Sequence, residues 1–579
     1  MIECKSIRVI LLAWLTLIVA FLIYLPPDLS VSLTIPPDSS EYSIGLVNFF
    51  RHGRFGFTLN GQWYPSRYPP WFSLSCLSPA YLLGGGDVLC LYWAVLAFSV
   101  ALVMLMYKWG RVLGLGMWSF IPPVLMMFLP DFVFYSRVVM TELPYATLFA
   151  GGALMFLSLS SRSSASLVHW LAAGMLVAWS GMARSTGLSM LLPFAILLLF
   201  KGGDGRFKIN AILLLFLPAI AYEVANLAYN WFVFGSPLRS GYQFWLSVPY
   251  DFPNLVFNYS YVIENAWKLI GDRVIQLTLF MFACTFVAAC LMLKGMFGGI
   301  NCNKRFLAFF AYLAFQTIVL VAIYIGYYWA DTRFFLPVTI CIVPLFFYCL
   351  WKMSRSWACW GRVFFLVAVA AVCAIGFLDC PTRYGYLVAP RMWNFRENLV
   401  AAEVLPSGSV VIKGGDPNVI DHFAFRAKNL TLLPLVRGFD YVSHMTAPKS
   451  IRNMCNAPSS WRQCVVDELV KDGRCSLPFP YVFAETPEAV KCLLENGCRV
   501  FFQEVIGNKD EKVDMEVIFR ILEKNGMYAQ KFGTWTVPAT SPNPIRHFYD
   551  IILLKGFTMD VCPEITVTYH EVFLLNDKS

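Results

Sequence analysis

The chain has 579 residues, of which 58% are hydrophobic and only 14% are charged. Soluble globular proteins carry about 25% charged residues, so this composition excludes an ordinary soluble protein and predicts membrane-spanning segments. The formal net charge is +9. Because most of the cations lie at the ends of apolar segments, membrane topology accounts for them, and a nucleic-acid partner is not expected.

Apolar segments long enough to cross a bilayer predict about eleven transmembrane helices. In chain order they cover residues 8–25, 89–107, 114–134, 141–160, 166–183, 186–200, 208–233, 274–294, 306–328, 334–351 and 362–378. The first of them is followed by PPDLS, which offers no small-residue cleavage site. We therefore expect it to be a membrane anchor and not a removed signal peptide.

Cations in the loops predict the orientation of these helices. Each loop predicted on the inner side carries at least one Lys or Arg: Lys108 and Arg111, Arg162, Lys201, Arg206 and Lys208, Lys294, Lys304 and Arg305, and Lys352, Arg355 and Arg362. Cytoplasmic loops are enriched in such residues, so the N-terminus is predicted to lie inside. An odd number of spans then places residues 380–579 outside the cytoplasm, and we expect a bacterial inner membrane with this part in the periplasm.

The first polar stretch, residues 26–88, places ionisable side chains directly after the first predicted span. Charges beside lipid are costly and uncommon unless they have a function. Asp38 and Glu41 lie three residues apart in a segment that can begin a helix after Pro36-Pro37. One interpretation is an N-terminal cap, which needs no further role for the pair. The other is catalysis, in which a carboxylate binds a metal or takes a proton from an attacking hydroxyl.

Aromatic and basic residues accompany this acidic pair. Tyr42 follows Glu41 directly and is placed to line the same pocket. Arg67 and Tyr68 belong to the segment RYPPW, which closes the stretch before the chain returns to the membrane. Aromatic residues at such a boundary are usually membrane anchors, so Tyr68 has both an anchoring and a substrate-binding interpretation.

Charged residues also occur at other outer span ends. Arg137 and Glu142 bracket the turn before the fourth predicted span, either as a local ion pair or with Glu142 as a second catalytic acid. Arg184 and Arg333 follow the same pattern, in MARSTG and YYWADTRFFLP. Guanidinium groups bind phosphate bidentately, although such side chains also extend toward lipid head groups. Glu223 is the main acid predicted inside a span. A hydrogen-bonded packing role and a catalytic role are equally compatible with this position.

The C-terminal third is more polar and predicts an α/β fold. LPSGSVVIKGGDP reads as a buried strand between two turns, and residues 486–503 as a helix, a Gly stop and a strand. We therefore expect two domains, a transmembrane catalytic domain over 1–379 and an extracytoplasmic α/β domain over 380–579. Seven cysteines fall in the latter, and some should form disulfides in an oxidising compartment: Cys380, Cys455, Cys464, Cys475, Cys492, Cys498 and Cys562.

Several short motifs follow one another along the first 350 residues or so. They are D-x-x-E-Y, Y-P-x-x-Y-P-P, R-x-x-M-x-E-L, A-R-x-x-G-L, F-G-S-P-L-x-S-G-Y ending at Tyr242, and D-T-R-F-x-L-P. Together they resemble the polytopic glycosyltransferases of the GT-C superfamily, nearest the branch of protein O-mannosyltransferases and lipid A aminoarabinose transferases. Protein O-mannosyltransferases have an adjacent Asp-Glu pair, which this chain lacks, so protein O-mannosylation is not favoured.

The resemblance implies transfer of a sugar from a polyprenyl-phosphate-linked donor on the non-cytoplasmic face. It assigns Asp38 as base or metal ligand, Glu41 as a supporting group and Glu142 as a second acid and metal ligand. It also implies substrate-binding roles for Tyr42, Arg67, Tyr68, Arg137, Arg184, Tyr242 and Arg333. No cofactor is required, although Mg²⁺ or Mn²⁺ would be compatible, and the acceptor would be a lipid, a glycan or a protein.

A transporter or flippase for a glycolipid is the alternative function. Such proteins usually place ionisable residues at the membrane midplane, often in repeated halves. Here the charged groups are predicted at one surface and the sequence shows no repeat. Sugar release from a lipid-linked donor would separate the two classes.

Overall fold

The structure is a computed structural model of the full chain. It describes residues 37–59, 62–86, 90–127, 129–136, 138–162, 165–200, 205–241, 259–293, 304–326, 331–356, 363, 367, 400–401, 404–414, 431–435, 487–495, 497–506, 515–537 and 565–575. The chain divides into two compact units. Met1–Pro26 and Trp71–Tyr384 form the first unit, and Pro27–Pro70 and Gly385–Ser579 form the second. Residues 27–70 of the first polar stretch therefore group with the C-terminal third.

Long apolar helices make this an integral membrane protein. Within the described residues, 5 helices are long and apolar enough to cross a membrane, or up to 6 if a bent pair counts as one span. The five are α5 (Cys90–Leu113), α8 (Glu142–Ser161), α11 (Gly205–Phe234), α16 (Lys304–Tyr324) and the span Thr332–Ser354, which contains most of α17 (Leu336–Ser356). The bent pair is α14 (Tyr259–Gly271) and α15 (Arg273–Leu293). Most predicted spans in the described part thus coincide with helices, but the predicted count of eleven is not confirmed.

Shorter apolar helices occupy other predicted spans. They are η2 (Gly116–Phe120) with α6 (Ile121–Met127), α7 (Pro130–Tyr135), α9 (Leu167–Ala183), and η3 (Ser185–Met190) with α10 (Leu191–Phe200). A further apolar helix, η1 (Ser73–Leu77) with α4 (Ser78–Leu83), lies within residues 26–88, where no span was predicted. The predicted span at 114–134 is broken, because Gly114 and Gly116 have positive φ and Pro130 begins a separate helix. The predicted span at 8–25 lies outside the described residues, as does nearly all of the one at 362–378.

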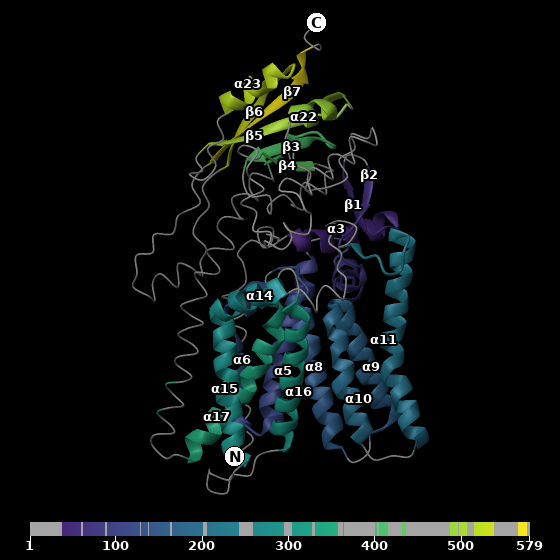
Figure 1. The fold of residues 1–579 in the computed structure, drawn as a ribbon, viewed down its shortest axis with the longest axis vertical. Helices are drawn as coiled ribbons and strands as arrows, with labels where there is room; N and C mark the ends of the chain where they lie inside the picture. Colours follow the sequence, from purple (N-terminus) through teal and green to yellow (C-terminus); the bar gives the residue numbers. More distant parts are fainter. Residues whose placement is uncertain are drawn as a thin grey trace. The chain divides into compact units, whose positions relative to one another are not determined.

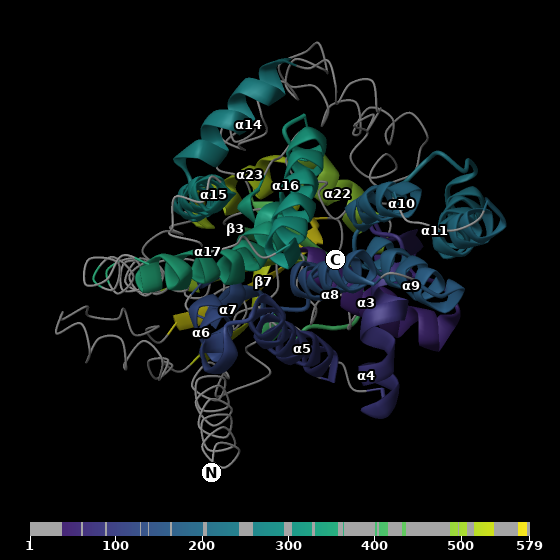
Figure 2. The same ribbon diagram turned by 90° about the horizontal axis from the view of Figure 1, so that it is seen from below.

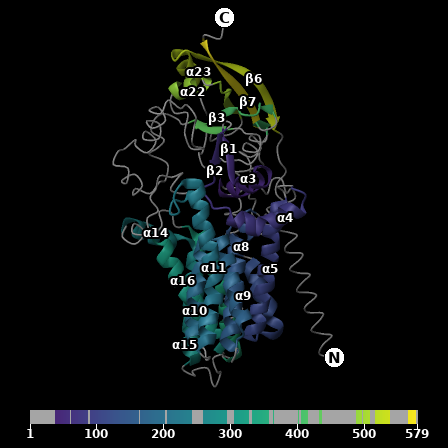
Figure 3. The ribbon, with the colours of Figure 1, turned by 90° about the vertical axis from the view of Figure 1, so that its right-hand side faces the viewer.

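Helix α8 lies inside the first unit, where it contacts α5, α9, α16 and α17 (Figures 1 and 2). Its first residue, Glu142, is thereby placed among several helices. Helices α9 and α11 also run side by side (Figure 3). A Cβ added at Gly174 of α9 would lie 2.5 Å from the carbonyl oxygen of Leu215, so only glycine allows this close approach.

The second unit contains a five-stranded mixed sheet in the order β4-β3-β5-β7-β6. The strands are β3 (Val410–Gly414), β4 (Thr431–Leu435), β5 (Val500–Ile506), β6 (Met527–Val537) and β7 (Ile565–Leu574). β3 pairs in parallel with β4 and β5, whereas β7 is antiparallel to β5 and β6. Residues of α22 (Pro487–Glu495) and α23 (Met515–Lys524) share an apolar core with the sheet. The strand predicted within LPSGSVVIKGGDP and the helix-turn-strand predicted at 486–503 are confirmed.

The first polar stretch forms a helix followed by a hairpin within the second unit. These are α3 (Pro37–His52), β1 (Gly56–Leu59) and β2 (Gln62–Pro65). Gly53 ends the helix with a φ of 68°, a conformation that favours glycine. A Cβ on Gly45 would lie 2.6 Å from the ring of Phe55, so this glycine lets the chain after α3 fold back onto the helix.

The cysteine prediction is tested at one position only. Cys498 precedes β5, and its thiol is free and half-buried. Burial raises the pKa of the Cys498 thiol above its usual value, which lowers its reactivity. The side chains of the other six cysteines of this region lie outside the described residues, so the predicted disulfides stay a prediction.

The predicted orientation has a direct test. A reporter that is active only in the cytoplasm, fused after Ser579, should be silent, because the loop cations place the C-terminus outside. The same reporter fused after Arg162 should be active and serves as the matched control. Activity of the C-terminal fusion would reverse the predicted orientation and place Glu41 and Glu142 on the cytoplasmic side.

Candidate functional site

A buried carboxylate lies at the first turn of α8 in the first unit. The side chain of Glu142 is 1% exposed. Its oxygen Oε1 accepts a hydrogen bond from Nη1 of Arg184 at 3.2 Å and lies 3.7 Å from Nε of Arg333. Oε2 accepts a longer bond of 3.4 Å from the hydroxyl of Thr141. A carboxylate at a helix N-terminus is favoured by the helix dipole, and here two guanidinium groups add to that effect.

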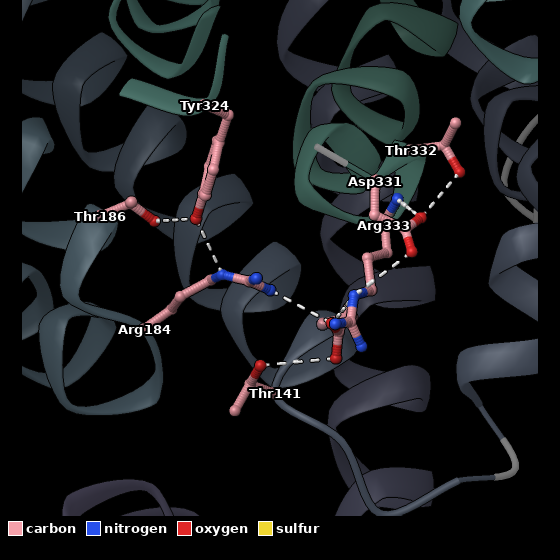
Figure 4. A network of polar contacts seen from close by, with 8 residues as sticks. Thr141, Arg184, Thr186, Tyr324, Asp331, Thr332 and Arg333 are labelled. Carbon is pink, nitrogen blue, oxygen red and sulfur yellow. Dashed lines mark hydrogen bonds and ion pairs between the residues drawn. The ribbon is translucent and has the colours of Figure 1, made fainter. Parts of the chain in front are cut away.

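Arg184 directly precedes η3 and is held from several directions (Figure 4). Its Nε donates to the hydroxyl of Tyr324 at 3.0 Å, and that hydroxyl in turn donates to Thr186 at 3.3 Å. The guanidinium carbon lies 4.5 Å from the ring centroid of Phe334, which is stacked against Tyr324 at 4.4 Å. Hydrogen bonds and aromatic rings therefore fix the guanidinium in one orientation.

Arg333 reaches Glu142 from η4 (Thr332–Phe335), which begins the span containing α17. Asp331 caps this short helix, since its Oδ1 accepts the backbone N–H of Arg333 at 3.2 Å. Oδ2 of Asp331 also lies 3.7 Å from Nε of Arg333. The two arginine side chains are 16% and 22% exposed, so each remains accessible while its partner carboxylate is buried.

Tyr135 of α7 lies beside the same charges. Its side chain is buried, and the charged groups that act on it include Glu142, Asp331 and Arg333. We call Glu142, Arg184, Arg333, Tyr324 and Asp331 the arginine-pair cluster.

A second acidic cluster lies in the second unit. Glu41 of α3 is 1% exposed and forms an ion pair with Nε of Arg67. Its Oε2 also accepts the hydroxyl of Ser66 at 2.9 Å and the backbone N–H of Arg67 at 2.8 Å. The hydroxyl of Ser66 accepts the N–H of Tyr68 at 3.1 Å. These bonds tie the helix to the turn after β2, so the contacts of Glu41 are those of an organising residue.

Aromatic rings complete this second cluster. The rings of Tyr42 and Tyr68 lie 4.6 Å apart, and the guanidinium carbon of Arg67 lies 5.4 Å from the Tyr68 ring centroid. Asp38 belongs to the first turn of α3, one turn before Glu41, but its side chain lies outside the described residues. Its assignment as base or metal ligand therefore stays a prediction.

The structure brings the predicted site residues together in two groups. Glu142, Arg184 and Arg333 converge in the first unit, and Glu41, Tyr42, Arg67 and Tyr68 converge in the second. Arg137 and Tyr242 lie outside the described residues. Sequence reasoning missed Tyr324 and Thr186, because a tyrosine in an apolar run and a threonine after an arginine carry no distinctive pattern. Phe334 was present within the D-T-R-F motif but was given no role.

The described residues contain no group of three or more His, Cys, Asp or Glu side chains that could hold a metal ion. Glu142 was predicted as a metal ligand together with Asp38. In the structure its carboxylate already faces two guanidinium groups. Their positive charge would repel a divalent cation at this position, so the surroundings of Glu142 suit an anionic ligand better than a metal.

Glu41 should stabilise the second unit through its charge. In Glu41→Gln the amide keeps one acceptor but loses the ion pair with Arg67, and hydrogen bonds to charged groups contribute about 1.5–3 kcal/mol. We expect faster hydrogen exchange in α3 by roughly 10- to 100-fold, measured by mass spectrometry on the purified protein. Glu516→Gln removes an exposed ion pair with Arg520 and should change nothing measurable. Unchanged exchange in Glu41→Gln would show that the ion pair contributes nothing to the fold.

Comparisons with known proteins establish the fold. No protein-family model and no curated protein matches the sequence significantly. The structure of ArnT from Cupriavidus metallidurans bound to undecaprenyl phosphate superposes with a TM-score of 0.50 at 12% identity, over 96% of this chain and 98% of that one. The chain has the GT-C fold. The resemblance inferred from the motif order is thereby confirmed for the fold.

Two further structures are similar to a lesser degree. ArnT from Cupriavidus metallidurans in the apo state gives a TM-score of 0.48 at 12% identity, over 96% of this chain and 97% of that one. The archaeal oligosaccharyltransferase AglB from Archaeoglobus fulgidus, in complex with an inhibitory peptide and a dolichol-phosphate, gives 0.47 at 11% identity. That alignment covers 85% of this chain and 69% of AglB.

Proposed function

We propose that this protein is an integral-membrane glycosyltransferase that moves a hexose or pentose from a polyprenyl-phosphate-linked donor to a lipid, glycan or protein acceptor on the extracytoplasmic face. One observation carries the proposal. Two partly accessible arginines from separate elements converge on one buried carboxylate at the end of an apolar helix. The GT-C fold supports it, and the similar ArnT structure binds undecaprenyl phosphate.

The arginine pair suits the phosphate of a lipid-linked sugar. Nε of Arg184 donates to Tyr324 and Nη1 to Glu142, and these bonds fix the orientation of a guanidinium group that stays 16% exposed. Guanidinium groups stay charged in low dielectric and bind phosphate oxygens bidentately. The buried carboxylate keeps the two like charges together before the phosphate arrives. In this proposal, then, Glu142 organises the site for the leaving group.

The reaction follows from these roles. The acceptor hydroxyl attacks the anomeric carbon and passes its proton to Asp38, while the bond between that carbon and the phosphate oxygen breaks. Arg184 and Arg333 stabilise the negative charge that develops on the leaving lipid phosphate. Glu41 holds α3 in place and so positions Asp38. Alignment of two bound substrates and charge stabilisation would supply much of the acceleration, and no step requires a metal.

Phosphate recognition is tested by substitutions that keep the positive charge but remove the planar guanidinium group. Arg333→Lys and Arg184→Lys each lose bidentate geometry, so binding of polyprenyl phosphate should weaken roughly 10- to 100-fold, as expected for charged hydrogen bonds. The measurement is binding of labelled polyprenyl phosphate to purified, monodisperse variants. Arg520→Lys in α23 changes an exposed arginine and is the matched control, expected to bind like wild type. Unchanged affinity in both variants would contradict phosphate binding and favour the alternative that these arginines contact lipid head groups.

A further inference from the structure

A second acidic site of the first unit has no part in the proposed transfer. Glu223 is a partly exposed carboxylate in α11, a helix of 30 residues. Only 22% of the residues in the most apolar part of this helix are buried inside the protein. Asn226 lies three residues later on α11, so the two side chains are neighbours on one face of the helix. Among the described residues, no Lys, Arg or His pairs with Glu223. An unpaired carboxylate on a lipid-facing helix is costly, and such acids mark binding sites.

Aromatic side chains lie on the same part of α11 as this carboxylate. Nε1 of Trp71 donates to Oδ1 of Asn226 at 2.9 Å, which holds the indole against α11 one turn from Glu223. The indole makes edge contacts with Tyr222 and Tyr229, each with centroids 6.2 Å apart and with interplanar angles of 83° and 70°. The buried hydroxyl of Tyr229 has no hydrogen-bond partner among the residues that the structure describes. We call Trp71, Tyr222, Glu223, Asn226 and Tyr229 the α11 aromatic cluster.

We infer that the α11 aromatic cluster binds the primary ammonium group of a membrane phospholipid. Steeply inclined aromatic rings beside a carboxylate form the chemistry that recognises organic cations, because ring faces and the carboxylate both attract positive charge. A neutral sugar hydroxyl would leave the carboxylate uncompensated. A divalent metal ion would require several carboxylate or carbonyl oxygens, whereas this cluster has one carboxylate.

A phospholipid is the favoured source because of the face that carries the cluster. Large apolar side chains next to Glu223 on α11 are exposed: Ile220 by 54%, Val224 by 60% and Leu227 by 38%. Such a surface contacts acyl chains in a membrane, so a head group with an amine would bring its tails alongside these residues. The site would then retain a specific lipid at the outer end of α11, independently of any sugar transfer.

The test uses the full-length protein in nanodiscs that contain equal amounts of phosphatidylethanolamine and its N-acetylated form. After detergent exchange, lipids that stay with the protein are quantified by mass spectrometry. Wild type should retain the free amine about tenfold over the acetylated lipid, the size of a desolvated cation–π and carboxylate contact. Glu223→Gln keeps the size of the side chain but should lose this preference, whereas Glu516→Gln in α23 should keep it.

The lipid comparison on wild type needs no variant to fold, so the inference can fail without ambiguity. Equal retention of both lipids by wild type would overturn it, as would an unchanged preference in Glu223→Gln. Displacement of the lipid by soluble glucosamine, but not by the matching neutral sugar, would assign the ammonium to an amino sugar and overturn the phospholipid assignment. None of these three outcomes depends on whether the protein transfers sugar.

Discussion

Asp38→Asn should give a folded protein that transfers sugar about 10²- to 10⁴-fold more slowly than wild type, the usual loss when a general base is removed. Asparagine keeps the size of the side chain and caps a helix as well as aspartate does. The change therefore removes proton acceptance and leaves the start of α3 intact. Sugar transfer is measured on purified, monodisperse protein, with hydrogen exchange in α3 as the check of folding.

Two variants sharpen the interpretation of Asp38→Asn. Glu41→Gln should reduce the rate of sugar transfer less than Asp38→Asn does. Glu41 already accepts hydrogen bonds from Ser66 and Arg67, so in this account it affects catalysis only through the position of α3. Glu516→Gln should be indistinguishable from wild type in both readouts. If Asp38→Asn turned over at the wild-type rate, Asp38 would be a cap only, and Glu142 would be the next carboxylate to test as the base.

Glu142→Ala should destabilise the first unit by about 2–3 kcal/mol. Removing one partner of a buried ion pair typically costs 3–5 kcal/mol, and the value is lower here because both arginines still reach solvent. The two guanidinium groups would also repel each other without the carboxylate. Thermal unfolding of the purified protein measures the loss, and Glu142→Gln, which keeps the size and one acceptor, should lose less.

The same variant tests whether the arginine pair is an anion site. Added polyprenyl phosphate supplies the negative charge that Glu142→Ala lacks, so it should raise the melting temperature of this variant more than that of wild type. A neutral polyprenol is the control ligand and should raise neither. Equal shifts in variant and wild type would mean that the phosphate does not bind where Glu142 holds the arginines.

Hydropathy predicted the helices well wherever one apolar run forms one helix. α5, α8 and α11 begin within about three residues of the predicted positions. The span predicted at 114–134 was wrong as a single helix, since an average over the window does not register the positive φ at Gly116 or the new helix at Pro130. In the C-terminal third, alternating patterns and Gly stops predicted the strand at Val410–Gly414 and the helix and strand around Gly497.

Site residues were predictable where charge stood out against an apolar background. Arg184 and Arg333 were singled out because cations are uncommon at outer span ends, and the structure brings both to Glu142. Their meeting could not be read from the sequence, because Arg184 and Arg333 lie far apart along the chain and only the packing of α8 against its neighbours joins them. Tyr324 could not be predicted as a site residue because an uncharged tyrosine does not stand out in an apolar segment. Its hydroxyl nevertheless orients Arg184.

Sugar transfer from a synthetic polyprenyl-phosphate-linked donor by the purified protein is the most direct test of the account. The measurement follows appearance of free polyprenyl phosphate together with a glycosylated acceptor from a total membrane extract that contains lipids, glycans and proteins, for wild type and for Asp38→Asn. The account predicts that both products form in equal amounts with wild type and that Asp38→Asn forms neither at a comparable rate. Movement of the intact donor across a vesicle membrane without cleavage of its sugar would contradict it and favour a transporter.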